Sequence, residues 1–519
     1  IDEIQQDKIR NWKSVILRVA HQEMEHLGLV CNMLNAIGGP QHFDRPNLPQ
    51  SKEYYQTAVD MQLSKFSLET MAAYMAFEKP DITPLDNYNL QLDQIVPTPI
   101  VIHNGHTVQE LYEAILNGFI YLDHHLSDKL FIGNPQSQVD GDTLGISFSN
   151  KEYGVTLTSV TNLDSAKKAI KRIIEQGEGV ILTGDKVLGQ NKALTDLYRH
   201  FDAEMIRFAA VKVDEKNWHS SVKQLAETGT AIEKNLTSAL RLLRETTTKK
   251  IVADSLKSVS ACVSVIRKLA GEKYSQAAAD KLNITRNALS ATATNDSEGA
   301  IISEIVVDKN CHYLAFWNLY QSLKEELRMQ PEFEAARRCA DNPMLNQHPE
   351  VADNKNVHMV THPYTRRVLE LFNAGYETMV DMLIIFYSNE GISSDERSLF
   401  ENTAFFPFMT MFIRPVGEVL SMLPLSEDKK DPLQSLRAGG SFEYYINTAW
   451  MPRTTPRWAY LAERLQQMAT LSAALQKPGD DLKKYMPPGN YANLLDNMSM
   501  LAVNMARINE NFKIGMNIK

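Results

Sequence analysis

The chain has little cysteine and no spacing of cysteines that suggests a disulfide framework. Its 519 residues include four cysteines, Cys31, Cys262, Cys311 and Cys339, and no Cys-x-x-Cys pair. Scattered single thiols are typical of proteins from reducing compartments. We therefore expect free cysteines and a cytoplasmic location.

Long apolar runs and blocks of one charge are also missing. A run such as Met382 to Tyr387 falls well short of the roughly 20 residues that a membrane helix needs. The formal net charge of -9 is modest for this length. We therefore expect no membrane span and no nucleic-acid partner.

Several common catalytic motifs are absent. The sequence contains no Gly-rich phosphate loop, no His-Glu-x-x-His zinc helix and no Gly-x-Ser-x-Gly elbow. Gly177-Glu178-Gly179 is too short to be a dinucleotide fingerprint. The first residue, Ile1, opens a polar stretch that is neither an initiator methionine nor a signal peptide, so we expect that a segment upstream is missing.

Helical periodicity dominates what is present. Between Lys8 and Ile37, apolar residues recur at spacings of three and four, and Gly38-Gly39-Pro40 is a stop signal. Few segments alternate as strands do. The sequence therefore predicts an all-α protein, with further helices over about 54–77, 108–130, 164–176, 301–320, 365–388, 395–423 and 456–476.

A helical hairpin is predicted over 218–271. Apolar residues keep helical spacing on both sides of a polar break at 245–250, and 290–298 is expected to be a flexible exit. The apolar seam from Leu225 to Leu269 is covered either by its own two arms or by another subunit, and the pattern does not decide which. We expect a homo-oligomer that associates through helical surfaces.

Glu23 and His26 are the first candidates for chemistry. They stand three residues apart within the predicted helix over 8–37, so both side chains project from one face. Glu-x-x-His within a long helix is the unit that helix bundles use in di-iron and di-manganese sites. The alternative is an exposed ion pair or a histidine whose hydrogen bonds are satisfied in the core.

The surrounding segments resemble a known family. The stretches from Trp12 to Leu27, Asn32 to Pro40 and Phe43 to Pro49 resemble the ferritin-like domain of the iminophenyl-pyruvate dimer synthase group, which includes the oxidative coupling enzymes of violacein-type and rebeccamycin-type bis-indole pathways. Nine later blocks continue the resemblance in order through most of the chain: 66–70, 110–115, 130–135, 174–179, 311–316, 340–343, 371–377, 413–418 and 440–443.

The resemblance implies a metal site and an oxidation. Its ligands would be Glu23, His26, Glu175, Glu178 and His312, holding iron, as a di-iron centre, or manganese. The implied substrate is a small molecule, an imine of an aromatic amino acid in a specialised metabolite pathway. No residue is assigned a catalytic role, and the use of a haem in addition stays open.

Each later ligand has another interpretation. Glu175 and Glu178 close a predicted helix, where carboxylates oppose the helix dipole unless a cation compensates them. His312, beside Cys311, is equally consistent with a role in the core. Two departures from the family pattern also matter: the helix expected before Ile1 is absent, and about 130 residues separate Glu178 from His312 where the family has a short connection.

The expected organisation is a ferritin-like bundle with an insertion. Residues 1–180 would form its first part, 181–300 the inserted hairpin, 301–330 its last helix and 331–519 a C-terminal helical domain. Two alternative functions remain open at this point. One is a non-catalytic scaffold that assembles through the hairpin, and the other is metal storage or peroxide detoxification without an organic substrate.

Overall fold

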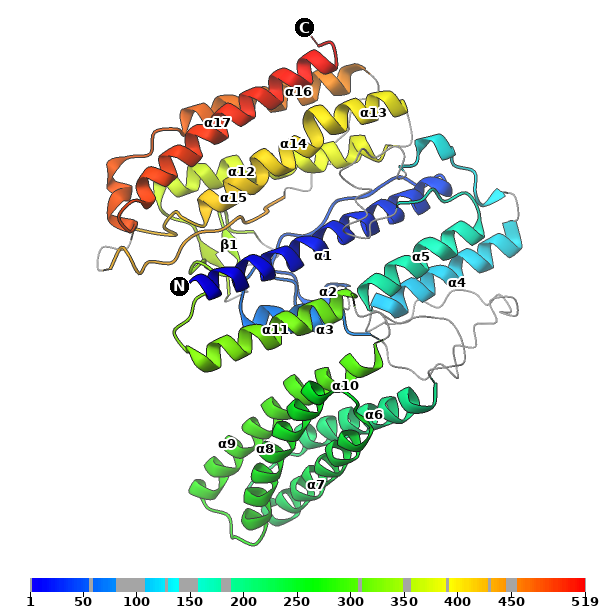
Figure 1. Cartoon of the computed structure of the whole chain (residues 1–519), viewed down its shortest axis with the longest axis vertical. Coiled ribbons are helices and arrows are strands. Elements are labelled where there is room, and N and C mark those ends of the chain that lie inside the picture. Colours follow the sequence, from blue (N-terminus) through cyan, green and yellow to red (C-terminus); the bar gives the residue numbers. More distant parts are fainter. Residues whose placement is uncertain are drawn as a thin grey trace. The chain divides into compact units, whose positions relative to one another are not determined.

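The computed structural model describes residues 2–55, 59–80, 108–126, 129–139, 157–178, 188–306, 310–348, 356–388, 392–427, 431–444 and 455–518. Helices dominate these ranges (Figure 1). Within them the named strands are β1 (Pro343–Met344) and β2 (His358–Met359), which pair in parallel. The prediction of an all-α protein is confirmed.

Helices form two compact units, each with its own core. Unit 1 comprises 1–77, 97–173 and 321–519, and unit 2 comprises 78–96 and 174–320. The helices are α1 (Glu3–Ala36), α2 (Lys52–Tyr55), α3 (Leu68–Phe77), α4 (Val108–Leu126), α5 (Leu163–Gly177), α6 (Leu188–Ala210), α7 (Trp218–Leu242), α8 (Thr246–Ala270), α9 (Gln276–Thr292), α10 (Glu298–Ile305), α11 (His312–Met329), α12 (Pro363–Phe386), α13 (Ser394–Phe400), α14 (Phe406–Phe408), α15 (Arg414–Leu420), α16 (Thr455–Ala474) and α17 (Asn490–Gly515), with short 3-10 helices η3 (Pro135–Ser137) and η8 (Asp480–Tyr485).

Helix α1 is capped at its start and hydrogen-bonded to α11 along one side. Asp2 and Gln5 form a reciprocal capping box, in which the Asp2 side chain accepts from the Gln5 N–H. Gln5 then donates to Glu326 of α11 at 2.8 Å, and the Trp12 indole donates to Ser322 at 3.0 Å. As residue numbers rise along α1, the partners on α11 fall, so the two helices are antiparallel.

The C-terminal part of unit 1 is a separate helical core. Helices α12, α15, α16 and α17 pack on one another, and α13 to α15 run on through two π-helical turns, η6 (Glu401–Phe405) and η7 (Met409–Ile413). Fully buried phenylalanines such as Phe400 and Phe412 fill the space between them. Such a π-turn inserts one extra residue into a helix and shifts which side chains face the core.

A buried carboxylate joins three separate segments of unit 1. Glu443 is 1 % exposed, and burial by itself would raise its pKa. The hydrogen bonds that its oxygens accept outweigh burial, so the pKa of Glu443 lies below its usual value. Its partners, all within 2.7 to 2.9 Å, are the N–H groups of Leu345 and Asn346 and the side chains of His348, Asn373 and Ser441.

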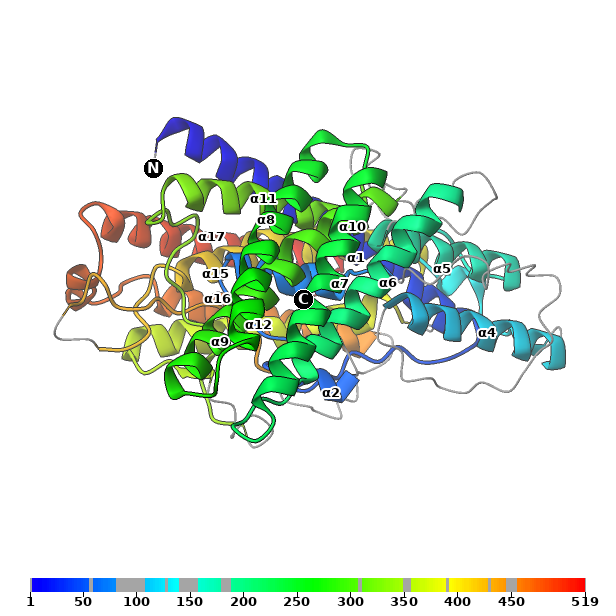
Figure 2. The same ribbon diagram turned by 90° about the horizontal axis from the view of Figure 1, so that it is seen from below.

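In unit 2 the predicted hairpin is present as α7 and α8 (Figure 1, Figure 2). Gly229 allows the close approach of its arms, because a Cβ there would lie 2.7 Å from Val263. The hairpin is not isolated, since α6 packs on α7, α9 packs on α8, and α10 contacts both α6 and α8. Within unit 2, the apolar seam of the hairpin is therefore covered by its own arms and these neighbours.

Some sequence expectations were wrong. Of the described residues in the helix predicted over 54–77, only those in α2 and α3 are helical. Between these helices, the backbone of Met61 pairs with that of Gln50, and the Leu63 N–H donates to the Asn342 side chain. These partners from other segments hold the backbone around 61–63 extended. The exit expected to be flexible at 290–298 is helical through a π-turn, η4 (Ala293–Ser297). Helices α6, α9 and α17 were not predicted.

Two absences expected from the sequence concern thiols and membranes. The four cysteines are free, with Cys31 and Cys311 buried, as expected. In the part of the chain that the structure describes, no helix combines the length and apolar character needed to cross a bilayer.

Replacing Glu443 should destabilise unit 1. Glu443→Ala removes the shared acceptor of five hydrogen bonds, four of which are buried, and loss of one partner of a buried charged network costs about 3 kcal/mol or more. We expect the melting temperature of the full chain, followed by circular dichroism, to fall by several degrees. Glu418→Ala, at a half-exposed ion pair with Arg414, serves as the control. Equal melting temperatures for the two variants would contradict this role.

Candidate metal centre

Glu23 and His26 lie on one face of α1, as their spacing predicts. His26 Nδ1 is 3.4 Å from Glu23 Oε2. The imidazole is buried, whereas the Glu23 side chain is 49 % exposed. The pair therefore has one donor in the core and one carboxylate that reaches water.

A second carboxylate on α1 has a different role. Glu25 is fully buried, and its Oε1 lies 3.4 Å from Nε of Arg172 on α5. A buried carboxylate needs such a cation, because desolvation would otherwise penalise its charge. Glu25 is thus occupied by Arg172, which sets it apart from Glu23 on the neighbouring face.

The antiparallel pairing of α1 and α11 explains why His312 belongs with Glu23 and His26. Ser322 meets Trp12, and His312 lies ten residues earlier on the same continuous helix, α11. Ten helical residues rise about 15 Å. Because the helices are antiparallel, the same distance along α1 towards higher residue numbers leads from Trp12 to the turn that carries Glu23 and His26.

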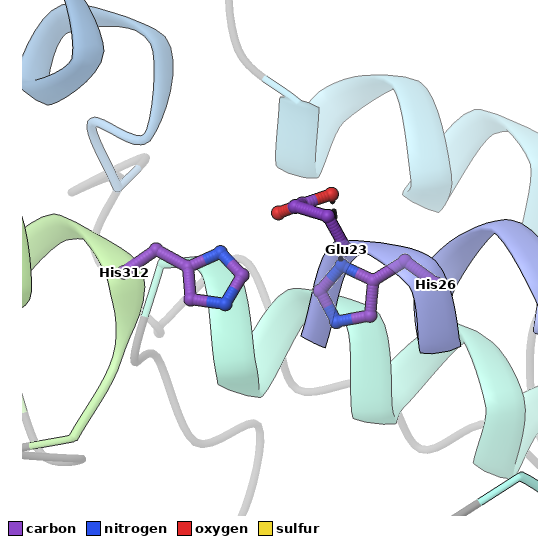
Figure 3. A group of neighbouring side chains, drawn as sticks. All are labelled: Glu23, His26 and His312. Atoms are coloured by element: carbon purple, nitrogen blue, oxygen red, sulfur yellow. Dashed lines mark ion pairs between the residues drawn. The ribbon is translucent and has the colours of Figure 1, made fainter. Parts of the chain in front are cut away.

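Figure 3 shows the resulting group: Glu23, His26 and His312 each offer one ligand atom, and these atoms lie within 4.8 Å of one another. His312 is completely buried. Among the described residues, this is the one group of three or more such side chains with that proximity.

Glu78 is a neighbour of His312 that the sequence did not reveal. It follows the last residue of α3, and its Oε1 lies 3.7 Å from Nδ1 of His312. Gly177, at the end of α5, leaves room for this carboxylate, since a Cβ there would approach Glu78 Oε2 to 3.1 Å. The pattern gave no signal for Glu78, because it falls where the predicted helix passes into a proline-rich loop.

The residue after Glu78 anchors this turn. Lys79 Nζ lies 2.5 Å from Glu298 Oε1 on α10 and 4.9 Å from the ring centroid of Tyr198 on α6. The Tyr198 hydroxyl donates to the same Glu298 oxygen at 2.6 Å. Burial, followed by the negative charge of Glu298, raises the pKa of Tyr198, so the phenol keeps its proton.

Glu175 and Glu178 lie at the end of α5, and neither is part of the three-residue group. Glu178 is 1 % exposed, and its N–H donates to the carbonyl of Ile174. Glu175 is half-buried. His124 and His125, in the last turn of α4, are exposed.

The donor set fits a divalent transition metal. Two imidazoles and one carboxylate are the ligands of non-haem iron sites that keep open positions, and manganese also accepts them. A symmetric di-iron bundle would carry Glu-x-x-His on a second helix. Three residues before His312 the sequence has Lys309 instead, so that second motif is incomplete.

Removing either buried imidazole should abolish stoichiometric metal binding. His26→Ala and His312→Ala each delete one of the donors within 4.8 Å of the others. We expect elemental mass spectrometry of the full chain to give near-integral iron or manganese for the parent protein and background metal for both variants. His125→Ala, at an exposed site, should keep the full content. Unchanged metal in both test variants, with unchanged helicity, would contradict the assignment.

Glu78 should strengthen metal retention through His312. Carboxylates that orient a ligating imidazole contribute about 10-fold to 100-fold in metal affinity. We expect Glu78→Gln to weaken manganese(II) affinity by that order in a competition titration with a chelator. Glu69→Gln, on the exposed face of α3, should change nothing. Equal affinities for the two variants would show that Glu78 does not act on the site.

Two comparisons with known proteins find similarities to this chain. Residues 3–202 match the family model described as ferritin-like. The chain is also 23 % identical over 176 residues to dichlorochromopyrrolate synthase of Lentzea aerocolonigenes, a match that covers 34 % of this chain and 17 % of that protein. No solved structure matches. The resemblance drawn from the sequence is therefore confirmed as a ferritin-like domain within residues 3–202 and a distant similarity to dichlorochromopyrrolate synthase.

Proposed function

We propose that the chain is a metal-dependent oxidoreductase whose ligands are Glu23, His26 and His312. The observation that carries this proposal is the proximity of one carboxylate and two buried imidazoles, with ligand atoms within 4.8 Å of one another, in a chain with a ferritin-like domain.

Iron or manganese held by such a set supplies redox chemistry with oxygen or peroxide. The chain's own residues prepare the site for it. His26 and His312 are both buried, so their imidazoles are shielded from bulk water. Glu78 Oε1 lies 3.7 Å from Nδ1 of His312, and a carboxylate at this position would orient the imidazole so that Nε2 could ligate.

Glu175 and Glu178 are proposed as additional ligands in a di-metal form of the centre. Buried Glu178 ends α5 beside Gly177, the residue whose missing side chain accommodates Glu78. A cation near these carboxylates would offset their unfavourable position at a helix C-terminus. The metal content distinguishes the two forms: one ion per chain supports the three-residue centre alone, and two support the larger set.

The proposed substrate is a small aromatic imine that undergoes oxidative coupling. Support comes from the similarity to dichlorochromopyrrolate synthase. The aligned part covers only 17 % of that protein's length. Fold and motif similarity does not transfer a substrate, so the organic substrate is the finer part of the proposal.

Oxygen consumption by the iron-loaded full chain tests this function. We expect uptake that depends on an aromatic 2-imino acid, generated in solution from the amino acid, and that falls at least about 100-fold in His26→Ala, because loss of the metal removes the redox centre. His125→Ala should retain the activity of the parent protein.

Two other results would redirect the interpretation. Rapid consumption of hydrogen peroxide with iron(II) and no organic substrate would favour metal storage or detoxification. Full metal occupancy without any turnover of oxygen or peroxide would contradict an oxidoreductase and favour a scaffold.

A further inference from the structure

Unit 1 contains a basic pocket that the metal centre does not use. Its volume is about 300 Å³, and its lining includes Arg337, Arg338, Arg437 and Tyr485. A space of this size corresponds to the lower end of small-molecule pockets. We call it the arginine pocket.

The charges around the arginine pocket are unbalanced. Arg338 is paired with Glu334 at 2.5 Å and also donates to Gln434. Arg337 donates to the Ser421 hydroxyl, and Arg437 donates to the carbonyl of Leu433, so neither meets a carboxylate in these contacts. Three guanidinium groups thus face one carboxylate among the lining residues, which leaves the pocket positive.

Two polar atoms in the lining are buried without a hydrogen-bond partner in the described structure. They are Nη1 of Arg437 and the hydroxyl oxygen of Tyr485. Tyr485 as a whole is 0 % exposed. Burial, with a smaller contribution from the charge of Arg337, lowers the pKa of Arg437. Buried donors almost always have hydrogen-bond partners in native proteins, so we expect an acceptor here that binds Nη1 of Arg437 and the Tyr485 hydroxyl.

A helix start adds positive potential at the same place. Helix α17 begins at Asn490, which lines the pocket, and its N-cap residue Gly489 provides no side-chain cap. The first N–H groups of a helix have no intrahelical partner and carry a partial positive charge. The N–H of Asn490 donates to the carbonyl of Pro487, so the start of this 26-residue helix contributes its partial positive charge beside the arginines rather than a free donor.

We propose that the arginine pocket binds the oxyanion of a small organic molecule, a carboxylate or a phosphate. Arg437 and Arg337 would contact the oxyanion, and the Tyr485 hydroxyl would donate to it. Both oxyanions match the planar donor pattern of guanidinium groups. The apolar part of the ligand would pack on Met422, Leu433 and Met486, which also line the pocket.

Calorimetric titration of the full chain tests this proposal, with inorganic phosphate and phenylacetate as separate probes in Tris chloride buffer. We expect saturable binding of at least one probe with a stoichiometry near one. Loss of a charged hydrogen bond weakens binding by about tenfold or more, so Arg437→Gln should raise the dissociation constant by that factor. Tyr485→Phe, which removes only the hydroxyl, should raise it severalfold.

The matched control is Arg507→Gln, which makes the same charge change on the exposed face of α17. It should bind as the parent protein does. Phosphate binding alone would identify a phosphorylated ligand, and phenylacetate binding alone a carboxylate. No saturable binding of either probe, or binding by Arg437→Gln and Tyr485→Phe equal to that of Arg507→Gln, would overturn the proposal. If Arg437→Gln fails to fold, Tyr485→Phe alone decides.

Discussion

The antiparallel pairing of α1 and α11 is the constraint on which the candidate metal centre depends. Gln5 and Trp12 on α1 bind Glu326 and Ser322 on α11 through hydrogen bonds at a buried interface. These contacts fix the register of two continuous helices. Because a helix rises regularly, the register set at one end determines which residues meet about 15 Å away, and there His312 joins Glu23 and His26.

Buried charge in this protein serves two different purposes. Glu443 and Glu25 are fully supplied with donors or a cation, so they stabilise the positions of the segments that they join. Arg437 instead has a buried donor, Nη1, without a hydrogen-bond partner in the described structure. Ligand binding is expected where a buried polar group lacks a hydrogen-bond partner, because such a group by itself does not stabilise the protein.

Helices α7 and α8 illustrate how a hairpin gains stability. The arms α7 and α8 are close because Gly229 faces Val263, yet two helices alone bury little apolar surface. Packing of α6 on α7 and of α9 on α8 enlarges the core of unit 2. The same unit carries Glu78, Lys79 and His312, so these helices form one compact body with His312 and the carboxylate beside it.

Local sequence was sufficient for the all-α class, for the hairpin and for the Glu23–His26 pair, because periodicity and three-residue spacing act within one helix. It failed for 59–67, where Gln50 and Asn342 hold the backbone extended, and for η4, where helical neighbours keep a polar segment helical. The family resemblance named His312 as a partner of Glu23 and His26, but no local pattern did, and Glu78 and the arginine pocket emerged only from the tertiary structure. Each depends on residues far apart in the chain, and their meeting follows from the register of packed helices rather than from any local pattern.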